Sequence, residues 1–113
     1  MVRPCKLRLI YFQPGATYYK PQGVPLRQLE ELNLTVDELE AIRLKYSEDL
    51  DQVDCAAKMN ISQSTFQRIL TSANKKIADA LTQGKAIKIE GGHIQLPRGF
   101  KRRFRHRRHS WSD

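Results

Sequence analysis

Seven polar side chains follow one another closely near the middle of this 113-residue chain and could make hydrogen bonds to a common partner. They are hydroxyls, amides and one guanidinium, with no carboxylate among them: Ser62, Gln63, Ser64, Thr65, Gln67, Arg68 and Thr71. Gln and Arg can form paired hydrogen bonds to adenine and guanine edges, and hydroxyls bond to phosphates or to either base. This chemistry favours base recognition in the major groove of DNA, although a solvated helix face in a small bundle would have the same polarity.

These side chains need a rigid support, and the surrounding residues predict a helix-turn-helix that begins at Gln52. Asn60 falls at the turn, where a positive φ is required and Asn is the best substitute for Gly. Ser62 is expected to cap the second helix, and Gly84 to end it. The inward positions carry small or apolar residues at three- and four-residue spacing: Ala56, Met59, Ile61, Phe66, Ile69, Leu70, Ala73, Ile77, Ala78 and Leu81.

Two further helices are expected before the motif. Residues 34–44 begin with a capping box of Thr35 and Glu38, and residues 25–32 suggest a shorter helix with proline in its first turn. The longer of the two would have an apolar stripe of Val36, Leu39, Ala41, Ile42 and Tyr46. We expect the carboxylates of this region to lie at helix starts or on outer faces, without an acid–base role: Asp37, Glu38, Glu40, Asp51 and Asp54.

Two segments outside the helices have the composition of strands. Residues 6–12 are aliphatic and aromatic, and residues 86–90 alternate with a period of two. They could pair as a small ribbon, with residues 12–25 between them in sequence as an ordered loop. The expected fold is therefore mainly α, a three- to four-helix bundle containing a helix-turn-helix, with a small β-ribbon from the N-terminal segment and the segment after the last helix.

The positive charge is concentrated at the C-terminus. The net charge is +8, and residues 97–113 contain 7 of the 20 Lys and Arg residues but 1 of the 12 Asp and Glu residues. We expect one domain over residues 1–96 and a flexible basic tail over residues 97–113. The tail could contact DNA, RNA or an acidic protein. The candidates for phosphate contact are Lys75, Lys76, Arg98, Lys101, Arg102, Arg103, Arg105, Arg107 and Arg108.

Catalysis, cofactors and metals have little support in the sequence. Cys5 and Cys55 are far apart and belong to no paired-cysteine zinc signature, and arginines separate His106 from His109. No glycine-rich phosphate loop, nucleophile elbow or membrane-length apolar run is present. We therefore expect a non-enzymatic protein of the cytoplasm, associated with the nucleoid, whose partner is double-stranded DNA and which does not contact a membrane.

Four segments of the chain resemble one family. LTVDELEAIRL (34–44) and STFQRILTSANKKIADAL (64–81) are similar to region four of sigma factors. Together with YYKPQGVPL (18–26) before them and GKAIKIEGG (84–92) after them, they are still more similar to domain-of-unknown-function family 134, small prokaryotic proteins predicted to bind DNA. The resemblance covers residues 3–92 and implies a DNA-binding protein that regulates transcription. The sequence departs from the family at the turn, where Asn60 replaces glycine, and at residues 51–57.

Two other functions stay open. An acidic surface of Glu30, Glu31, Glu38 and Glu40 could contact RNA polymerase or another regulator, as sigma-region-four-like domains do. The basic tail could instead bind nucleic acid without sequence preference. One helix-turn-helix covers few base pairs, so a homodimer is also conceivable, with contacts from the N-terminal ribbon or from the far end of the long helix at residues 77–81.

Overall fold

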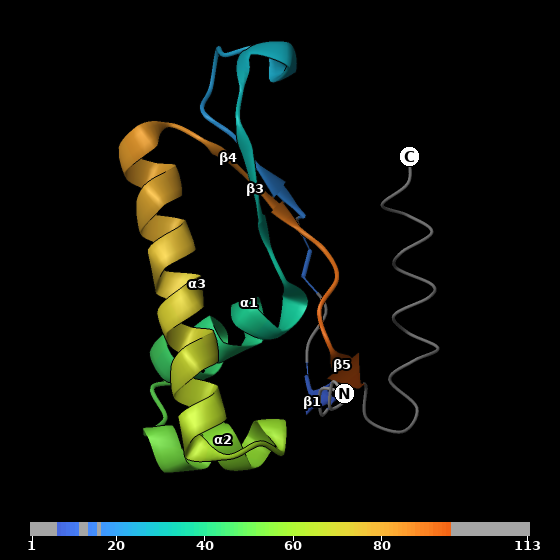
Figure 1. The fold of residues 1–113 in the computed structure, drawn as a ribbon, viewed down its shortest axis with the longest axis vertical. Helices are drawn as coiled ribbons and strands as arrows, with labels where there is room; N and C mark the ends of the chain where they lie inside the picture. The colour runs from blue at the N-terminus through green and yellow to red at the C-terminus, as the bar shows by residue number, and fades with distance from the viewer. Residues whose placement is uncertain (1–6, 12–13, 16, 96–113) are drawn as a thin grey trace, which may run out of the picture.

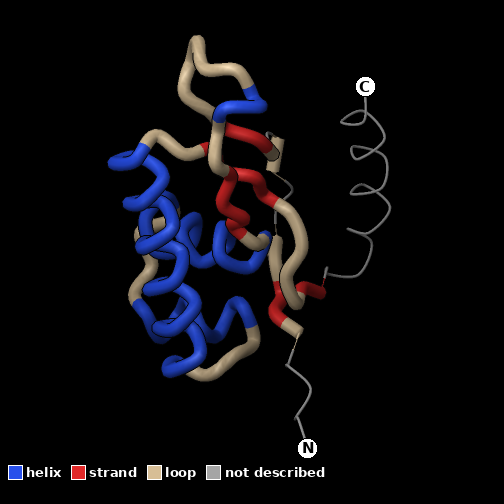
Figure 2. Tube along the Cα trace, turned by 45° about the horizontal axis from the view of Figure 1, so that its top comes forward, coloured by secondary structure: helices blue, strands red, loops and turns tan. Residues whose placement is uncertain are grey.

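The helices of this protein lie on one side and its short strands on the other (Figure 1, Figure 2). The computed structural model describes residues 7–11, 14–15 and 17–95. Along them the order of elements is β1, β2, η1, β3, α1, η2, α2, α3, β4 and β5. The long helix α3 (Gln63–Gln83) contacts α1, α2 and two of the strands. This architecture confirms the mainly α fold with a small β-ribbon.

The helices begin where their capping residues predict. Helix α1 (Val36–Ile42) has the full capping box, with Thr35 and Glu38 each bonded to the other's backbone N–H. It continues into a π-helical turn, η2 (Arg43–Ser47). Helix α2 (Gln52–Met59) is capped by Asp51 and α3 by Ser62, whose side chain accepts a hydrogen bond from the amide of Thr65. Gly84, at φ 69°, ends α3 in the left-handed conformation.

The strands form two small sheets. In the first, β4 (Ala86–Ile89) lies between β2 (Tyr18–Tyr19) and β3 (Glu31–Leu34), antiparallel to β2 and parallel to β3. In the second, β1 (Arg8–Leu9) pairs in parallel with β5 (Ile94–Gln95). The N-terminal segment and the segment after α3 therefore pair as expected, but through different strands. Strand β4 already has a neighbouring strand on each side, so residues 8–9 pair beyond the bend at Gly91 and Gly92, both of which have positive φ.

The expected helix over residues 25–32 is wrong. A single 3-10 turn, η1 (Leu26–Gln28), is followed directly by strand β3. The burial of β3 alternates along its length, with Leu32 and Leu34 on the more buried face. All four residues pair with β4, and the hydrogen bonds of this pairing outweigh the helical propensity of their Leu and Glu side chains.

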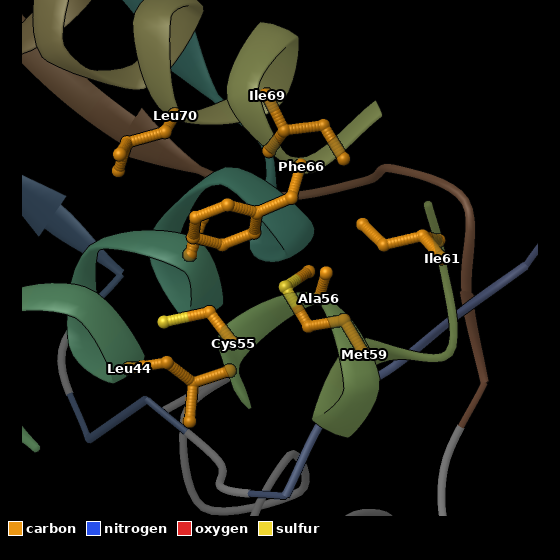
Figure 3. Close-up of a cluster of buried hydrophobic side chains, with 9 residues drawn as sticks. Leu44, Cys55, Ala56, Met59, Ile61, Phe66, Ile69 and Leu70 are labelled. Atoms are coloured by element: carbon orange, nitrogen blue, oxygen red, sulfur yellow. The ribbon is translucent and has the colours of Figure 1, made fainter. Parts of the chain in front are cut away.

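One hydrophobic cluster holds α2 against the start of α3 (Figure 3). Phe66, Met59 and Cys55 are fully buried, and Ala56 and Ile61 are nearly so, as the motif predicts. A second cluster joins the middle of α3 to the strands through Ala73, Leu34 and Ile89. Burial raises the pKa of the Cys55 thiol, which is a packing residue here.

The apolar positions at the far end of α3 were only partly predicted. Ala78 is exposed and Leu81 is 76% exposed, whereas Ala80 is buried. Beyond Ala73 the covered stripe includes Lys76, which bonds to Glu38 of α1, and Ile77, which packs on the second cluster, but not Ala78 or Leu81. Tyr46 is likewise exposed, and Leu44 in η2 is buried instead. The π-helical turn changes the spacing of inward positions at this point.

The carboxylates of α1 are buried: Asp37 and Glu38 lie at the helix start, as expected, but Glu40 is not on an outer face. Glu40 is completely buried, and Asp37 and Glu38 are nearly so. Each has a cationic partner: Arg8 for Asp37, Lys76 for Glu38 and Arg43 for Glu40. A buried carboxylate needs such compensation, and through these pairs α1 is linked to β1, α3 and η2. The acidic surface proposed for protein contact is therefore wrong for Glu38 and Glu40.

Glu38 joins α1 to α3, and its hydrogen bonds make the stability of the fold sensitive to acid. Burial alone would raise the pKa of Glu38, but hydrogen bonds from Lys76, Ser72 and the amide of Thr35 outweigh it and hold the pKa below the ordinary value. The folded state then binds fewer protons than the unfolded state, so the contribution is present above the unfolded pKa, about 4.3, and is lost as pH falls through the folded pKa.

Glu38→Gln is therefore expected to flatten the acid side of the stability profile. Urea midpoints compared between about pH 7 and about pH 3 should fall less in the variant than in the parent chain, because one linked proton is removed. Glu90→Gln, which changes an exposed carboxylate, is the control. If the urea midpoints of the parent and of Glu38→Gln fall equally between these pH values, protonation of Glu38 does not contribute to the acid sensitivity.

Candidate nucleic-acid interface

The turn between α2 and α3 sets the angle at which α3 is presented. Asn60 adopts φ 58° and ψ 46°, and its amide donates back to the carbonyls of Ala56 and Ala57. The amide of Ile61 donates to Ala56 over 3.1 Å, which places the Ile61 side chain between the helices. The two helices and this turn form the helix-turn-helix-like unit that the sequence predicts.

The left-handed backbone conformation at Asn60 restricts which residue types this position tolerates. Asn60→Ala is expected to lower the free energy of unfolding by about 1–2 kcal/mol, because a left-handed backbone brings Cβ close to the following carbonyl. Asn60→Gly should stay within about 1 kcal/mol of the parent. Urea denaturation of the three chains measures both differences. Equal stability of the alanine and glycine variants would show that the strain is not located here.

All seven predicted recognition residues lie together at the start of α3, with Ser62 as its cap and the other six on its first three turns. Thr65 is half-buried and the others are exposed. The hydroxyls are ordered by one another, since Ser62 Oγ lies 2.9 Å from Thr65 Oγ1 and 3.2 Å from Ser64 Oγ. Arg68 Nη2 donates to Thr65 Oγ1 over 3.4 Å, and Gln67 Nε2 donates to Thr71 Oγ1 over 3.2 Å. The result is a carboxylate-free surface of donors and acceptors, which we call the recognition face: Ser62, Gln63, Ser64, Thr65, Gln67, Arg68 and Thr71.

Gln52 borders the recognition face and was not predicted as part of it. Its side-chain Nε2 donates to the carbonyl of Gln63 over 3.4 Å, so the start of α2 lies against the start of α3. The sequence offered a signal, because Gln52 is the first residue of the motif's first helix, and that helix crosses the DNA backbone in known helix-turn-helix complexes. Two exposed carboxylates lie close to Gln52 in the chain, Asp51 one residue before it and Asp54 two residues after it.

The two predicted phosphate contacts on α3 differ in their surroundings. Lys75 is exposed and its Nζ lies 2.9 Å from Asp79, one turn further on. Lys76 is partly buried, and its Nζ donates to Glu38 over 2.8 Å and to the carbonyl of Asn33 over 2.7 Å. The structure therefore gives Lys76 a role in holding α3 to α1 and leaves Lys75 accessible. The remaining candidates lie outside the described residues: Arg98, Lys101, Arg102, Arg103, Arg105, Arg107 and Arg108.

Among the described residues, no group of three or more His, Cys, Asp or Glu side chains could hold a metal ion. Over the same ranges, no helix is both long enough and apolar enough to span a bilayer.

Of the four glutamates expected to form an acidic surface, Glu30 and Glu31 are exposed, and Glu31 accepts a 2.6 Å hydrogen bond from the Tyr18 hydroxyl. This bond raises the pKa of Tyr18.

Comparison with known proteins gives one family and a set of relatives. The family model described as protein of unknown function DUF134 matches residues 1–97. A UPF0251 protein of Moorella thermoacetica is 57% identical over 111 residues, which cover 98% of this chain and 74% of the relative. UPF0251 proteins of Caldanaerobacter subterraneus and Thermoanaerobacter pseudethanolicus are 56% and 50% identical, over 85% and 98% of this chain and 81% and 97% of their own lengths. No solved structure matches the chain.

Proposed function

This chain belongs to the DUF134 family, and we propose that it is a sequence-specific DNA-binding protein that regulates transcription. The observation that carries the proposal is the recognition face, seven polar side chains without a carboxylate on the first turns of α3. The helix is held rigidly behind this face by the buried cluster of Phe66, Met59 and Ala56 (Figure 3). A preorganised helix start of this kind suits insertion into a major groove.

The residues of the recognition face take different roles in the proposal. Arg68 can donate two hydrogen bonds to the O6 and N7 atoms of guanine, and Gln63 and Gln67 can each pair with adenine. Hydroxyl groups such as those of Ser64 and Thr71 suit phosphate oxygens, which fix the position of the helix on the duplex. Lys75, two turns further along α3, adds a positive charge for the DNA backbone.

The basic tail supports a second candidate, binding to nucleic acid without sequence preference. Seven Lys and Arg residues in residues 97–113 would contact phosphates through charge alone, and such binding weakens steeply as salt is raised. In our proposal the tail adds affinity to a complex whose sequence preference comes from α3. A role restricted to protein docking has less support, since Glu38 and Glu40 are buried.

A selection of genomic duplex fragments tests the proposal. The full chain and a chain ending at Leu96 are each incubated with the fragments at near-physiological salt, and the bound duplexes are sequenced. We expect both chains to recover the same motif, with weaker overall binding for the shorter one. Recovery of no motif, together with loss of binding on truncation, would assign nucleic-acid binding to the tail and overturn the proposal.

A further inference from the structure

The end of α3 that lies away from α2 (Figure 1) carries apolar side chains that the rest of the described chain leaves exposed. Leu81 is 76% exposed and Ala78, one turn earlier, is also exposed. Next to them is an open hollow of about 340 Å³, lined by Tyr19, Pro21, Leu81 and Ile87 and by the two lysines Lys20 and Lys85. We call Ala78, Leu81, Tyr19 and the hollow the distal face.

The distal face is not accounted for by the packing within the chain. The buried stripe of α3 passes through Ala73 and Ala80, whereas Ala78 and Leu81 point to another side of the helix. Their spacing of three residues places both on one exposed surface. Leu81 and Tyr19 line the same hollow, so their exposed apolar surfaces are contiguous, and a contiguous apolar patch is typical of an interaction site.

We propose that a second copy of this chain covers the distal face, forming a two-fold symmetric dimer in which the two α3 helices cross near Ala78 and Leu81. The inference rests on the proposed function in one respect: a single helix-turn-helix contacts few base pairs, and two copies on one duplex double the number. Ala78 has a small side chain, which allows two helix backbones to approach closely.

The charges near the distal face favour a copy of the chain over a partner of one charge sign. Lys20 and Lys85 line the hollow, and the largely exposed carboxylate of Glu30 lies 3.6 Å from Lys85. In a two-fold contact the same surface is present on both partners, so the lysines of one copy can face the glutamate of the other. A uniformly acidic or basic partner would meet a charge of its own sign on this surface, because both signs are present.

The position along α3 also suits two-fold binding to DNA. About 16 residues separate the contact near Asp79 from Gln63, which at 1.5 Å per residue is roughly 24 Å. Two helices that cross there can place their first turns up to about 48 Å apart, a range that includes the separation of about 34 Å between successive turns of the major groove. The recognition face lies on the first half of the helix, whose start is next to α2 (Figure 1), so a contact at the other end leaves it uncovered.

Sedimentation velocity of the full chain without DNA tests the dimer. We expect the parent chain to sediment with twice the single-chain mass in the micromolar range, and Leu81→Glu to raise the dissociation constant of the dimer at least about tenfold. Val53→Glu is the matched control, because Val53 is a 55% exposed apolar residue on α2, away from the distal face. Circular dichroism confirms that both variants are folded.

A cross-link provides a second measurement that does not depend on dimer strength. With Cys5 changed to serine, Leu81→Cys should form a disulfide-linked dimer under mild oxidation, because a two-fold axis near this residue brings the two copies of it together. Val53→Cys should not. The buried Cys55 is retained in both chains.

Two results would overturn the inference: a single-chain mass for the parent throughout the micromolar range, or a dimer that is unchanged by Leu81→Glu. The first would leave the distal face to a different protein or to a small apolar ligand. Since the mass is measured without DNA, a monomer that still recovers a motif would leave the proposed function standing. A dimer that recovers no motif would support the inference about the distal face and count against the proposed function.

Discussion

Replacing Gln63, Gln67 and Arg68 together with alanine is expected to weaken binding to the selected duplex by at least about 100-fold. Each side chain that pairs with a base edge contributes roughly 1–3 kcal/mol of discrimination, so three lost contacts exceed about 3 kcal/mol. All three residues are exposed and outside the buried cluster, so the fold should be retained. Fluorescence anisotropy at near-physiological salt measures the affinity, and circular dichroism the fold.

A variant that removes the same residue types elsewhere is the control for this loss. Arg27→Ala combined with Gln83→Ala removes one exposed guanidinium and one exposed amide, in η1 and at the end of α3. The affinity of this chain for the duplex should stay within about twofold of the parent's. Salt screens the interaction between the duplex and a charge as distant from it as Arg27. If both variants bind equally well, the recognition face does not contact the bases.

The second large effect is expected in stability. Glu40→Ala should lower the free energy of unfolding by about 3–5 kcal/mol, because it removes one partner of a buried ion pair. The fully buried Glu40 carboxylate accepts bonds of 2.8 and 3.0 Å from the Arg43 guanidinium and one of 3.1 Å from the amide of Tyr11. Its loss strips Arg43 of its closest partner and leaves the Tyr11 amide without this acceptor. Urea denaturation measures the difference.

Glu48 provides the matched control, because it pairs with the same arginine at the surface. The distance from Arg43 Nη1 to Glu48 Oε2 is 3.1 Å, and the Glu48 side chain is 53% exposed. Glu48→Ala is expected to cost less than about 1 kcal/mol, since exposed ion pairs contribute little. A Glu40→Ala chain as stable as Glu48→Ala would show that burial of the carboxylate does not matter to the fold.

Features decided by neighbouring residues could be predicted from the sequence. The caps at Thr35 and Ser62, the left-handed turn at Asn60 and the glycine that ends α3 each depend on hydrogen bonds or steric limits within a few residues. The recognition face follows from the same local order, because the capped start of α3 fixes which side chains point outward. The position of all seven residues at the start of α3 could therefore be predicted from the sequence.

Features decided by contacts between residues far apart in the sequence could not be predicted in this way. The burial of Glu40 depends on the amide of Tyr11, 29 residues away in sequence, and Lys76 is tied to α1 through Glu38, 38 residues away. The segment at residues 31–34 has side chains suited to a helix, and only its pairing with β4 makes it a strand. The exposure of Leu81 likewise depends on distant residues, because an open hollow lies between it and Tyr19 of β2 and Ile87 of β4.

The measurement that tests base recognition by α3 most directly is a duplex selection with Arg68→Ala beside the parent chain. If Arg68 pairs with a guanine, the variant should recover the same motif with the preference relaxed at one base pair, and its affinity for other changes in the motif should keep the same order. If Arg68→Ala instead weakens every sequence equally and leaves each base preference unchanged, Arg68 contacts only the DNA backbone. That result would contradict its assignment as a base-reading residue of the recognition face.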